Sequence, residues 1–414
     1  VELVDGLVAF SQNRFPSLRL DMGAINDLVA PLLPAGFYYK TFKWPAKAWP
    51  WYEKWIRRAA GMGRVPTEVD PDRYETVHTH TDLLVVGGGI AGLAAADSGA
   101  AAGRRVILID DAGFFGGVPA DEPVEGVEQN AWVENVVRRL ARNPLVALYP
   151  RTIVTGHFDD NLVMAIEHVV GAGPRLRRHM ITCEQIVLAT GAFERPLIFQ
   201  NNDRPGVMLA EAAHRYVREH AVAAGRKALL YANHDRAYAA IFALQDAGVD
   251  IAATVDQRDQ LPASLSRELE RRNIRSLRGA LLLDARGRKR IRGVTVARAN
   301  GADREAISCD LVLTSGGYTP ATQIFTHVNG TLRWDEDRQA FLPNQTDSTP
   351  CAIGACAGEW SVAGCIEAGR AVGRGRPLPP LVPITPMAKP MMPKSDKAFV
   401  DPQNDVTTGA IRLA

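Results

Sequence analysis

Apolar and polar positions between residues 82 and 110 predict a strand, a helix and a second strand. Residues 82–86 and 105–109 are short apolar runs, and residues 90–102 between them have the length and composition of a helix. Continuously apolar strands are typical of a parallel sheet that helices cover on both faces. The segment therefore predicts a βαβ unit.

Similar patterns recur along the chain. A helix is expected at 130–142, strands at 151–155, 161–168, 176–182 and 186–188, and a later helix at 361–373. A second βαβ-like unit begins at Lys227, with a strand at 228–231, a helix at 236–246 and a strand at 249–255. Two apolar segments around the turn at 286–288 predict a hairpin, and 310–314 predicts one more strand.

These elements predict an α/β fold with two dinucleotide-binding, Rossmann-like domains. The nucleotide-binding domain is expected at 79–203 and 309–374, with a degenerate second Rossmann-like domain inserted at 204–308. Residues 1–78 lack clean periodicity and form an irregular, aromatic-rich arm, which either packs on the main body or forms a subunit interface. Seven prolines in 375–393 indicate that 375–414 is a Pro-rich linker or extended tail.

Composition narrows the function classes. A formal net charge of +2 predicts no nucleic-acid partner, since a basic footprint needs a clustered excess. No apolar run reaches the ~20 residues that cross a bilayer, and no signal-peptide pattern is seen, so we expect a cytoplasmic protein with no membrane partner. Five cysteines without a paired framework fit a reducing compartment, and the spacing of Cys351, Cys356 and Cys365 is unlike that of a metal site.

The glycine turn between the first strand and helix carries the chemistry. Gly87, Gly88, Gly89, Ile90, Ala91 and Gly92 match the GxGxxG pattern that seats a pyrophosphate. The first glycine allows the tight turn, the second lets the backbone approach the phosphate, and the third allows close packing of helix on sheet. The positive helix end supplies the binding energy.

An acid at the end of the second strand completes the pattern. Asp110 lies roughly 20 residues beyond the turn, where a carboxylate accepts from the adenosine ribose hydroxyls and repels a 2′-phosphate. That favours NAD or FAD over NADP. Asp111 is the rival for this role, although neighbouring strand residues point to opposite faces. Gly116 and Gly117 follow on a loop that is either part of the site or a plain turn.

The second βαβ unit lacks a phosphate seat. Aligned on the first, it places Ala232, His234 and Ala237 where Gly87, Gly89 and Gly92 stand. The His234 ring occupies the position that must be bare, so we expect one working nucleotide site.

The order of these motifs resembles flavoproteins with two dinucleotide domains, the class of glutathione reductase. In that class Ala189, Thr190 and Gly191 mark the exit to the second domain. Thr190 and Gly191, together with Gly354 and Ala355 on the late strand, are expected to contact the cofactor. Flavin-binding members usually carry an acid where Ala355 stands. A lost charge-assisted hydrogen bond of about 1.5–3 kcal/mol favours NAD at the turn, with FAD as the alternative occupant.

Four segments resemble the α subunit of heterotetrameric sarcosine oxidase. They are LPAGFYYKTFKWP at 33–45, PDRYE at 71–75, NDRPGVM at 202–208 and KAFVD at 397–401. The resemblance implies an α subunit that holds NAD, with FAD and FMN expected on a partner β subunit, and further small subunits in the complex. It also implies oxidative demethylation of sarcosine to glycine with hydrogen peroxide, the one-carbon unit passing to tetrahydrofolate.

The resemblance leaves three matters open. The family's α chain has a domain before Val1 and a folate-binding, aminomethyltransferase-like domain after Ala414, so we expect this sequence to be a piece of a longer chain. No catalytic residue can be nominated, and no metal is expected, since His78 and His80 have no third ligand nearby. Alternatives are a stand-alone FAD-dependent pyridine-nucleotide oxidoreductase, an opine or proline dehydrogenase-type large subunit, and a structural NAD scaffold without redox role.

Overall fold

The computed structural model describes most of the chain after residue 72 and parts of the segment before it. The described residues are 15–17, 19–25, 42, 44–60, 69, 72–119, 122–171, 173–298, 303–346, 348–391, 395, 397–401, 404 and 406–413. They form two units, 1–72 and 73–414. In the first unit, 3-10 helices η1 (Met22–Ala24) and η3 (Ala46–Ala48) precede helix α3 (Trp49–Ala59). Much of the aromatic segment 33–45 lies outside the described residues.

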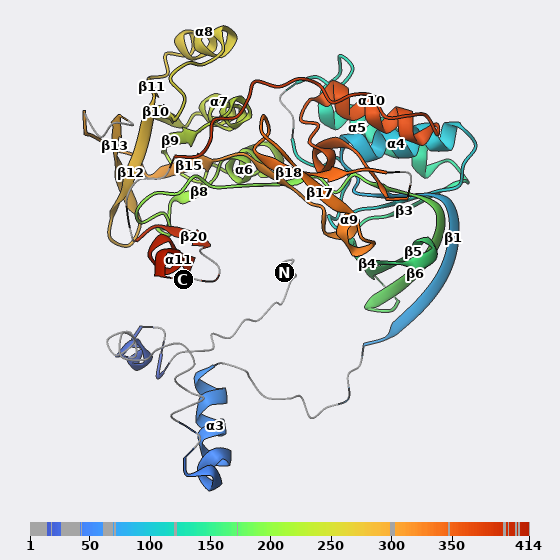
Figure 1. Cartoon of the computed structure of the whole chain (residues 1–414), viewed down its shortest axis with the longest axis horizontal. Coiled ribbons are helices and arrows are strands. Elements are labelled where there is room, and N and C mark those ends of the chain that lie inside the picture. The colour runs from blue at the N-terminus through green and yellow to red at the C-terminus, as the bar shows by residue number, and fades with distance from the viewer. Residues whose placement is uncertain are drawn as a thin grey trace. The chain divides into compact units, whose positions relative to one another are not determined.

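A seven-stranded sheet forms the first domain of the second unit (Figure 1). Its strands run in the order β3-β2-β1-β6-β5-β4, with β19 also beside β6; the bounds are β1 (Tyr74–Val86), β2 (Val106–Ile109), β3 (Val146–Tyr149), β4 (Thr152–Phe158), β5 (Leu162–His168), β6 (Leu176–Leu188) and β19 (Cys351–Ala352). The β3-β2-β1-β6 part is parallel, whereas β4 and β5 pair antiparallel. Strand β1 already begins at Tyr74, so the expected arm ends earlier than residue 78.

Three helices pack on one face of this sheet: α4 (Ile90–Ala101), α5 (Gln129–Ala141) and α10 (Val362–Gly373) (Figure 1). Glycines bring α10 against the backbone of α4. A Cβ on Gly369 would lie 2.4 Å from the Ala91 carbonyl oxygen, and one on Gly373 would lie 2.1 Å from Ser98 Oγ. The first turn of α4 is therefore held by a neighbour at backbone distance.

The second domain is built on a five-stranded parallel sheet of order β11-β10-β9-β15-β8. Its elements are β8 (Val207–Leu209), α6 (Ala210–His220), β9 (Lys227–Ala232), 3-10 helix η5 (Asp235–Ala237), α7 (Tyr238–Asp246), β10 (Asp250–Asp256), α8 (Ala263–Arg271), β11 (Ser276–Arg278) and β15 (Leu311–Ser315). The expected hairpin is present as β12 (Ala280–Gly287) and β13 (Ile291–Arg298), joined by β14 (Glu305–Ile307).

The boundary expected at residue 309 is wrong. Strand β15 pairs with β8 and β9 of the second sheet, so the chain returns to the first domain only after Ser315. The two crossings, β7 (Ala192–Glu194) and β16 (Tyr318–Pro320), lie antiparallel to each other. The apolar run at 310–314 was correctly predicted as a strand, but an apolar run does not reveal which of two parallel sheets it joins.

The return segment carries small elements around the end of the first sheet. They are α9 (Gln323–His327), the hairpin β17 (Thr331–Asp335) and β18 (Ala340–Asn344), and the 3-10 helix η6 (Gly354–Ala357). The 3-10 helix η4 (Asp159–Asn161) lies earlier, between β4 and β5. Residues 376–391 form neither helix nor strand, as the prolines predict. After them come β20 (Phe399–Asp401), β21 (Val406–Thr407) and α11 (Thr408–Leu413). Across the described part of the chain, no helix is long and apolar enough to span a membrane.

The close contact between α10 and α4 generates a stability prediction. Gly369→Ala places a methyl group 2.4 Å from the Ala91 carbonyl and 3.0 Å from the Ala95 nitrogen. We expect a loss of about 1–3 kcal/mol in the free energy of unfolding, because overpacking outweighs the roughly 1 kcal/mol that alanine gains over glycine in a helix. Urea unfolding measures it. Glu367→Ala, on the exposed side of the same helix, should be near neutral, and an equal loss in both variants would contradict the prediction.

Candidate functional site

The glycine turn joins the end of β1 to the start of α4. Gly87 has φ +101°, and a Cβ there would lie 2.2 Å from the Ala189 carbonyl oxygen. A Cβ on Gly92 would lie 1.8 Å from the Gly87 carbonyl oxygen. The first and last glycines are therefore required by the protein's own packing.

Gly89 differs, because nothing in the protein crowds it. The nearest atom to a Cβ at this position is the Gly117 Cα, 3.7 Å away, and the φ of −71° suits any residue. Gly89 also caps α4 without a side-chain hydrogen bond to the first turn, which begins with Ile90 and Ala91. A bare backbone beside an uncapped helix N-terminus fits a pyrophosphate.

Asp110 lies directly after β2 and faces the turn. Its Oδ2 accepts a hydrogen bond from the Gly88 amide at 2.5 Å, and its Oδ1 accepts one from the Ala112 amide at 2.8 Å. Burial raises the pKa of Asp110, and the two amide hydrogen bonds oppose this shift. Asp111 is exposed. Of the two candidates for the ribose, Asp110 is the one beside the phosphate turn.

The loop carrying Gly116 and Gly117 lies directly on the turn. The Gly116 amide donates to the Gly88 carbonyl at 2.9 Å, and a Cβ on Gly117 would lie 2.9 Å from the Gly89 Cα. Gln129 at the start of α5 holds the loop by donating to the Gly116 carbonyl at 3.1 Å. A cavity of about 500 Å³ opens beside it, lined by Phe114, Pro119, Glu128, Gln129, Asn130 and the last residues of α6.

The remaining predicted residues divide into two groups. Gly354, after β19, has φ +62°, and a Cβ there would lie 2.8 Å from the Ala91 Cβ, so it packs on the first turn of α4. Ala355 follows it in η6. The Thr190 hydroxyl donates to the Ala321 carbonyl at 2.7 Å, and Gly191 turns the chain there with φ +75°. Thr190 and Gly191 thus shape the crossing between domains.

The corresponding turn of the second domain is filled by His234. This side chain is 3% exposed, and its Nε2 lies 2.8 Å from Ser315 Oγ at the end of β15. Its ring also contacts the Tyr318 ring edge-on, with centroids 5.4 Å apart. Burial lowers the pKa of His234 to about 3, so the imidazole is neutral.

The acid at the end of β10 is also engaged inside the protein. Asp256, the counterpart of Asp110, is fully buried. It accepts hydrogen bonds from Arg258 Nε at 3.0 Å and Nη2 at 2.8 Å, and from the Tyr238 hydroxyl at 2.8 Å. A carboxylate held in this way cannot face a ribose. Sequence reasoning missed the pair, although an acid after the second strand was visible at Asp256.

A buried polar chain links this crevice to the crossing strands. Glu194 of β7 accepts from the Ser315 hydroxyl and, at 2.7 Å, from the Glu211 amide. Ser315 in turn contacts His234. Burial raises the pKa of Glu194 to about 8. The three residues lie far apart in the sequence, so no local pattern could have indicated the contact.

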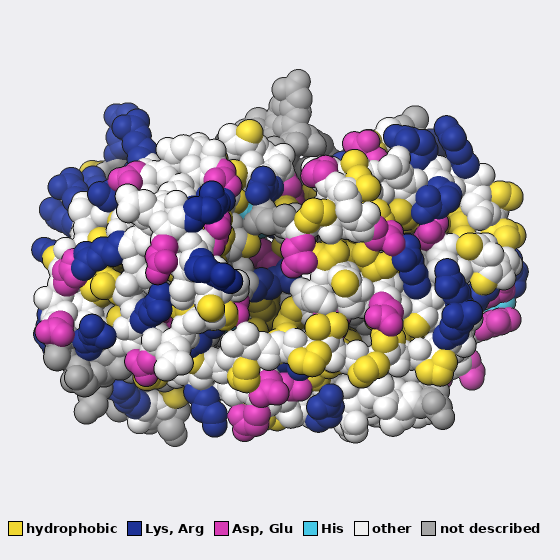
Figure 2. Space-filling view, turned by 90° about the horizontal axis from the view of Figure 1, so that it is seen from above, with side chains coloured by type: hydrophobic (Ala, Val, Ile, Leu, Met, Phe, Trp, Pro, Cys, Tyr) yellow, Lys and Arg dark blue, Asp and Glu magenta, His cyan; other side chains and the backbone are white. Residues whose placement is uncertain are grey.

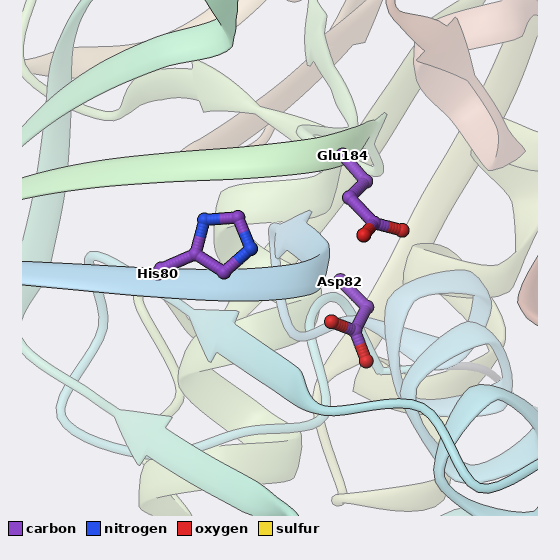
Figure 3. A group of neighbouring side chains, drawn as sticks. All are labelled: His80, Asp82 and Glu184. Carbon is purple, nitrogen blue, oxygen red and sulfur yellow. The ribbon is translucent and has the colours of Figure 1, made fainter.

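Three possible metal ligands lie together on the first sheet (Figure 3). His80 and Asp82 of β1 approach Glu184 of β6, with ligand atoms within 4.8 Å of one another. The expectation that His80 has no further ligand nearby is therefore wrong, because the parallel pairing of β1 and β6 brings Glu184 beside it. Arg105 already binds Asp82 through its side chain and its amide, which lowers the pKa of that carboxyl.

Charge on the surface is mixed. On the face drawn in Figure 2, basic and acidic side chains alternate, and neither sign gathers into one continuous patch.

The chain is similar in sequence to known oxidoreductases. Residues 82–178 match the family of FAD dependent oxidoreductases. The whole chain is 38% identical to the sarcosine oxidase α subunit of Rhizobium meliloti, and it covers 44% of that protein. The chain is a relative of sarcosine oxidase α subunits. This confirms the resemblance predicted from the sequence, and the chain spans less than half of the relative's length.

Two further similarities are more distant. One subunit of the opine oxidase of Rhizobium meliloti is 26% identical over 63% of this chain and 55% of its own length. The crystal structure of L-proline dehydrogenase from P. horikoshii has a TM-score of 0.56 at 21% identity, covering 74% of this chain and 56% of that chain. The family match and the shared fold confirm the predicted α/β architecture of the dinucleotide-binding kind.

The open position at Gly89 generates a binding prediction. Gly89→Val should leave the fold intact, because the nearest protein atom to the new Cβ is 3.7 Å away. The side chain fills the space through which a pyrophosphate approaches, so the purified variant should carry less than about a tenth of the wild-type nucleotide. Nucleotide released on denaturation is quantified, with circular dichroism as the control for folding. Full occupancy in a folded variant would refute the assignment.

Glu194 generates a pH prediction. Its pKa is about 8 in the folded chain and about 4.5 when unfolded, so the unfolded state loses its proton first as pH rises. The contribution of Glu194 to stability is fully present below pH 4.5 and is lost as pH rises towards 8. Glu194→Gln mimics the protonated acid and should flatten this decline.

Urea unfolding of wild type and variant at pH 7 and pH 8 isolates the effect, since the titration of the unfolded histidines near pH 6.5 contributes equally to both proteins. Identical pH slopes for wild type and Glu194→Gln would show that Glu194 does not retain its proton.

Proposed function

We propose that this chain is the NAD-binding part of the α subunit of a sarcosine oxidase complex. The observation that carries the proposal is 38% identity over the whole chain with a sarcosine oxidase α subunit. In this proposal the complex demethylates sarcosine oxidatively and passes the one-carbon unit to tetrahydrofolate. A β subunit carries FAD and FMN and performs most of the oxidation.

The turn at Gly87–Gly92 is the proposed dinucleotide seat. Gly89 supplies bare backbone and α4 supplies the positive helix end, while Asp110 is poised to accept from the adenosine ribose. Gly116 and Gly117 would close over the pyrophosphate from the other side, since they already contact the turn.

NAD is the proposed occupant, with FAD as the alternative. Ala355 stands where flavin-binding relatives of this fold usually offer an acid, and no charged side chain replaces it at that position. A bound nicotinamide can take up or return a hydride. The chain's own residues would bind and orient it: Asp110 fixes the ribose, and the amides at the start of α4 hold the phosphates.

Stand-alone FAD-dependent reduction of a pyridine nucleotide is less well supported. That activity needs a second nucleotide in the second domain, where His234 and the Asp256–Arg258 pair occupy the crevice. The similarity to a subunit of an opine oxidase keeps an opine-type amine substrate as the second candidate. A structural NAD that never turns over is the third.

Nucleotide identity and turnover test the proposal. Denaturing the chain should release about one NAD per chain, identified by mass. Release of FAD without NAD would overturn the cofactor assignment. In the complex with its partner subunits, adding sarcosine under anaerobic conditions should produce an NADH absorbance near 340 nm; flavin reduction without NADH would favour the structural role, and reduction by opines alone would favour the second candidate.

A further inference from the structure

Residues 382–391, called the strap below, cross the crevice of the second domain. The Asn233 side-chain amide donates to the Ala388 carbonyl at 2.8 Å, and the Ala388 amide donates to the Asn233 carbonyl at 3.3 Å. Gln257 holds Met391 with both halves of its side-chain amide: its Nε2 donates to the Met391 carbonyl at 2.8 Å, and its Oε1 accepts from the Met391 amide at 3.0 Å. Two polar residues therefore each satisfy both the donor and the acceptor of one strap residue.

The two anchoring residues lie where a dinucleotide would bind. Asn233 follows β9 and corresponds to Gly88 of the glycine turn, while Gln257 directly follows β10, one position after Asp256, the counterpart of Asp110. Both are buried, with exposures of 1% and 3%. In open α/β sheets, ligands bind outside the carboxyl ends of such strands. The strap thus lies across the ligand side of the second sheet.

The strap is also attached to the first domain. Glu359, which follows η6 and is 3% exposed, accepts from the Val382 amide at 2.8 Å. Arg338, after β17, donates to the Val382 carbonyl at 2.8 Å. Met387 is 8% exposed, and its amide donates to the Asp337 carbonyl at 2.8 Å. One extended segment is bound by both domains.

We propose that the strap is the resident ligand of the second domain, closing its nucleotide crevice and joining the two domains. A peptide group offers one donor and one acceptor, as a ribose hydroxyl does, so the amides of Asn233 and Gln257 bind backbone where a nucleotide sugar and phosphate would otherwise lie. Pro383, Pro386 and Pro390 keep the strap extended, which reduces the entropy lost when it is ordered. This inference does not depend on which nucleotide the first domain holds.

His234 and Arg258 explain why no nucleotide competes with the strap for the crevice. The histidine ring fills the phosphate position, and the arginine withdraws Asp256 from the crevice. The second domain has the strand ends of a nucleotide site, but the polar side chains there bind other parts of the same chain. Each chain should then hold a single dinucleotide.

Hydrogen exchange followed by mass spectrometry on the full chain tests the proposal. In wild type, peptides covering 384–391 should exchange slowly. In Asn233→Ala/Gln257→Ala they should exchange at least about tenfold faster, because the variant loses both hydrogen bonds to Met391 and the one from Asn233 to the Ala388 carbonyl. Fast exchange in wild type, or no change in the folded double variant, would overturn the proposal.

The chain offers a matched control. Asn202 holds Phe399 of the tail with the same reciprocal pair, both bonds at 2.8 Å, but away from the crevice. Asn202→Ala should speed exchange around Phe399 and leave 384–391 unchanged. Acceleration of 384–391 by this variant would mean that the tail is held as a whole and the crevice plays no special part.

Titration with NADH tests occupancy without any variant. Millimolar NADH should leave exchange of the wild-type strap unchanged, and the chain should bind one equivalent of dinucleotide in total. Binding of a second equivalent, or faster strap exchange on adding NADH, would show that the strap is displaced and refute its role as the resident ligand. These outcomes do not bear on the identity of the first nucleotide or on amine oxidation.

Discussion

Contact between bare backbones around α4 is the constraint on which the first domain depends. At Gly87 the chain passes within reach of the Ala189 carbonyl, at Gly92 the helix closes on Gly87, and at Gly369 the neighbouring helix meets Ala91. Any side chain at these positions would push the helix N-terminus away from the strand end. The N-terminus of α4 points at the turn because the residues at these positions have no side chains. Of the glycines in the GxGxxG pattern, Gly89 is the one whose missing side chain leaves space beside the helix N-terminus.

The two domains share one architecture but use the corresponding residues differently. In both, a strand ends in a turn into a helix, and a second parallel strand ends in an acid. In the first domain the acid, Asp110, supports the turn through the Gly88 amide. In the second, Asp256 is neutralised by Arg258, and the turn is filled by a neutral histidine. Small changes of residue type thus convert a ligand site into internal structure.

Most of the fold could be predicted from the sequence because the patterns that encode it are local. The βαβ units, the hairpin and the glycine turn are each encoded within about thirty residues, and the blocking role of His234 follows from one alignment of the two units. Signals that require distant partners were missed. The sheet to which β15 belongs, the approach of Glu184 to His80, and the contact from Glu194 through Ser315 to His234 each depend on how strands from different parts of the chain pair.

The candidate site was predicted to a similar extent. Residue types at 87–92 and at 110 predicted a seat whose geometry is consistent with the chemistry assigned to it. Whether Gly116 and Gly117 belonged to it could not be decided from a glycine pair alone, because a plain turn has the same composition. The hydrogen bond from the Gly116 amide to the Gly88 carbonyl decides the contact.

The antiparallel pair of crossing strands has a mechanical consequence. Strands β7 and β16 lie side by side where the chain crosses between the domains, and they form a narrow hinge. Residues 382–391 make a further connection away from this hinge, so rotation of the domains would change the span between Val382 and Ala388. Relative rotation of these two domains would therefore have to break the hydrogen bonds at one end of residues 382–391.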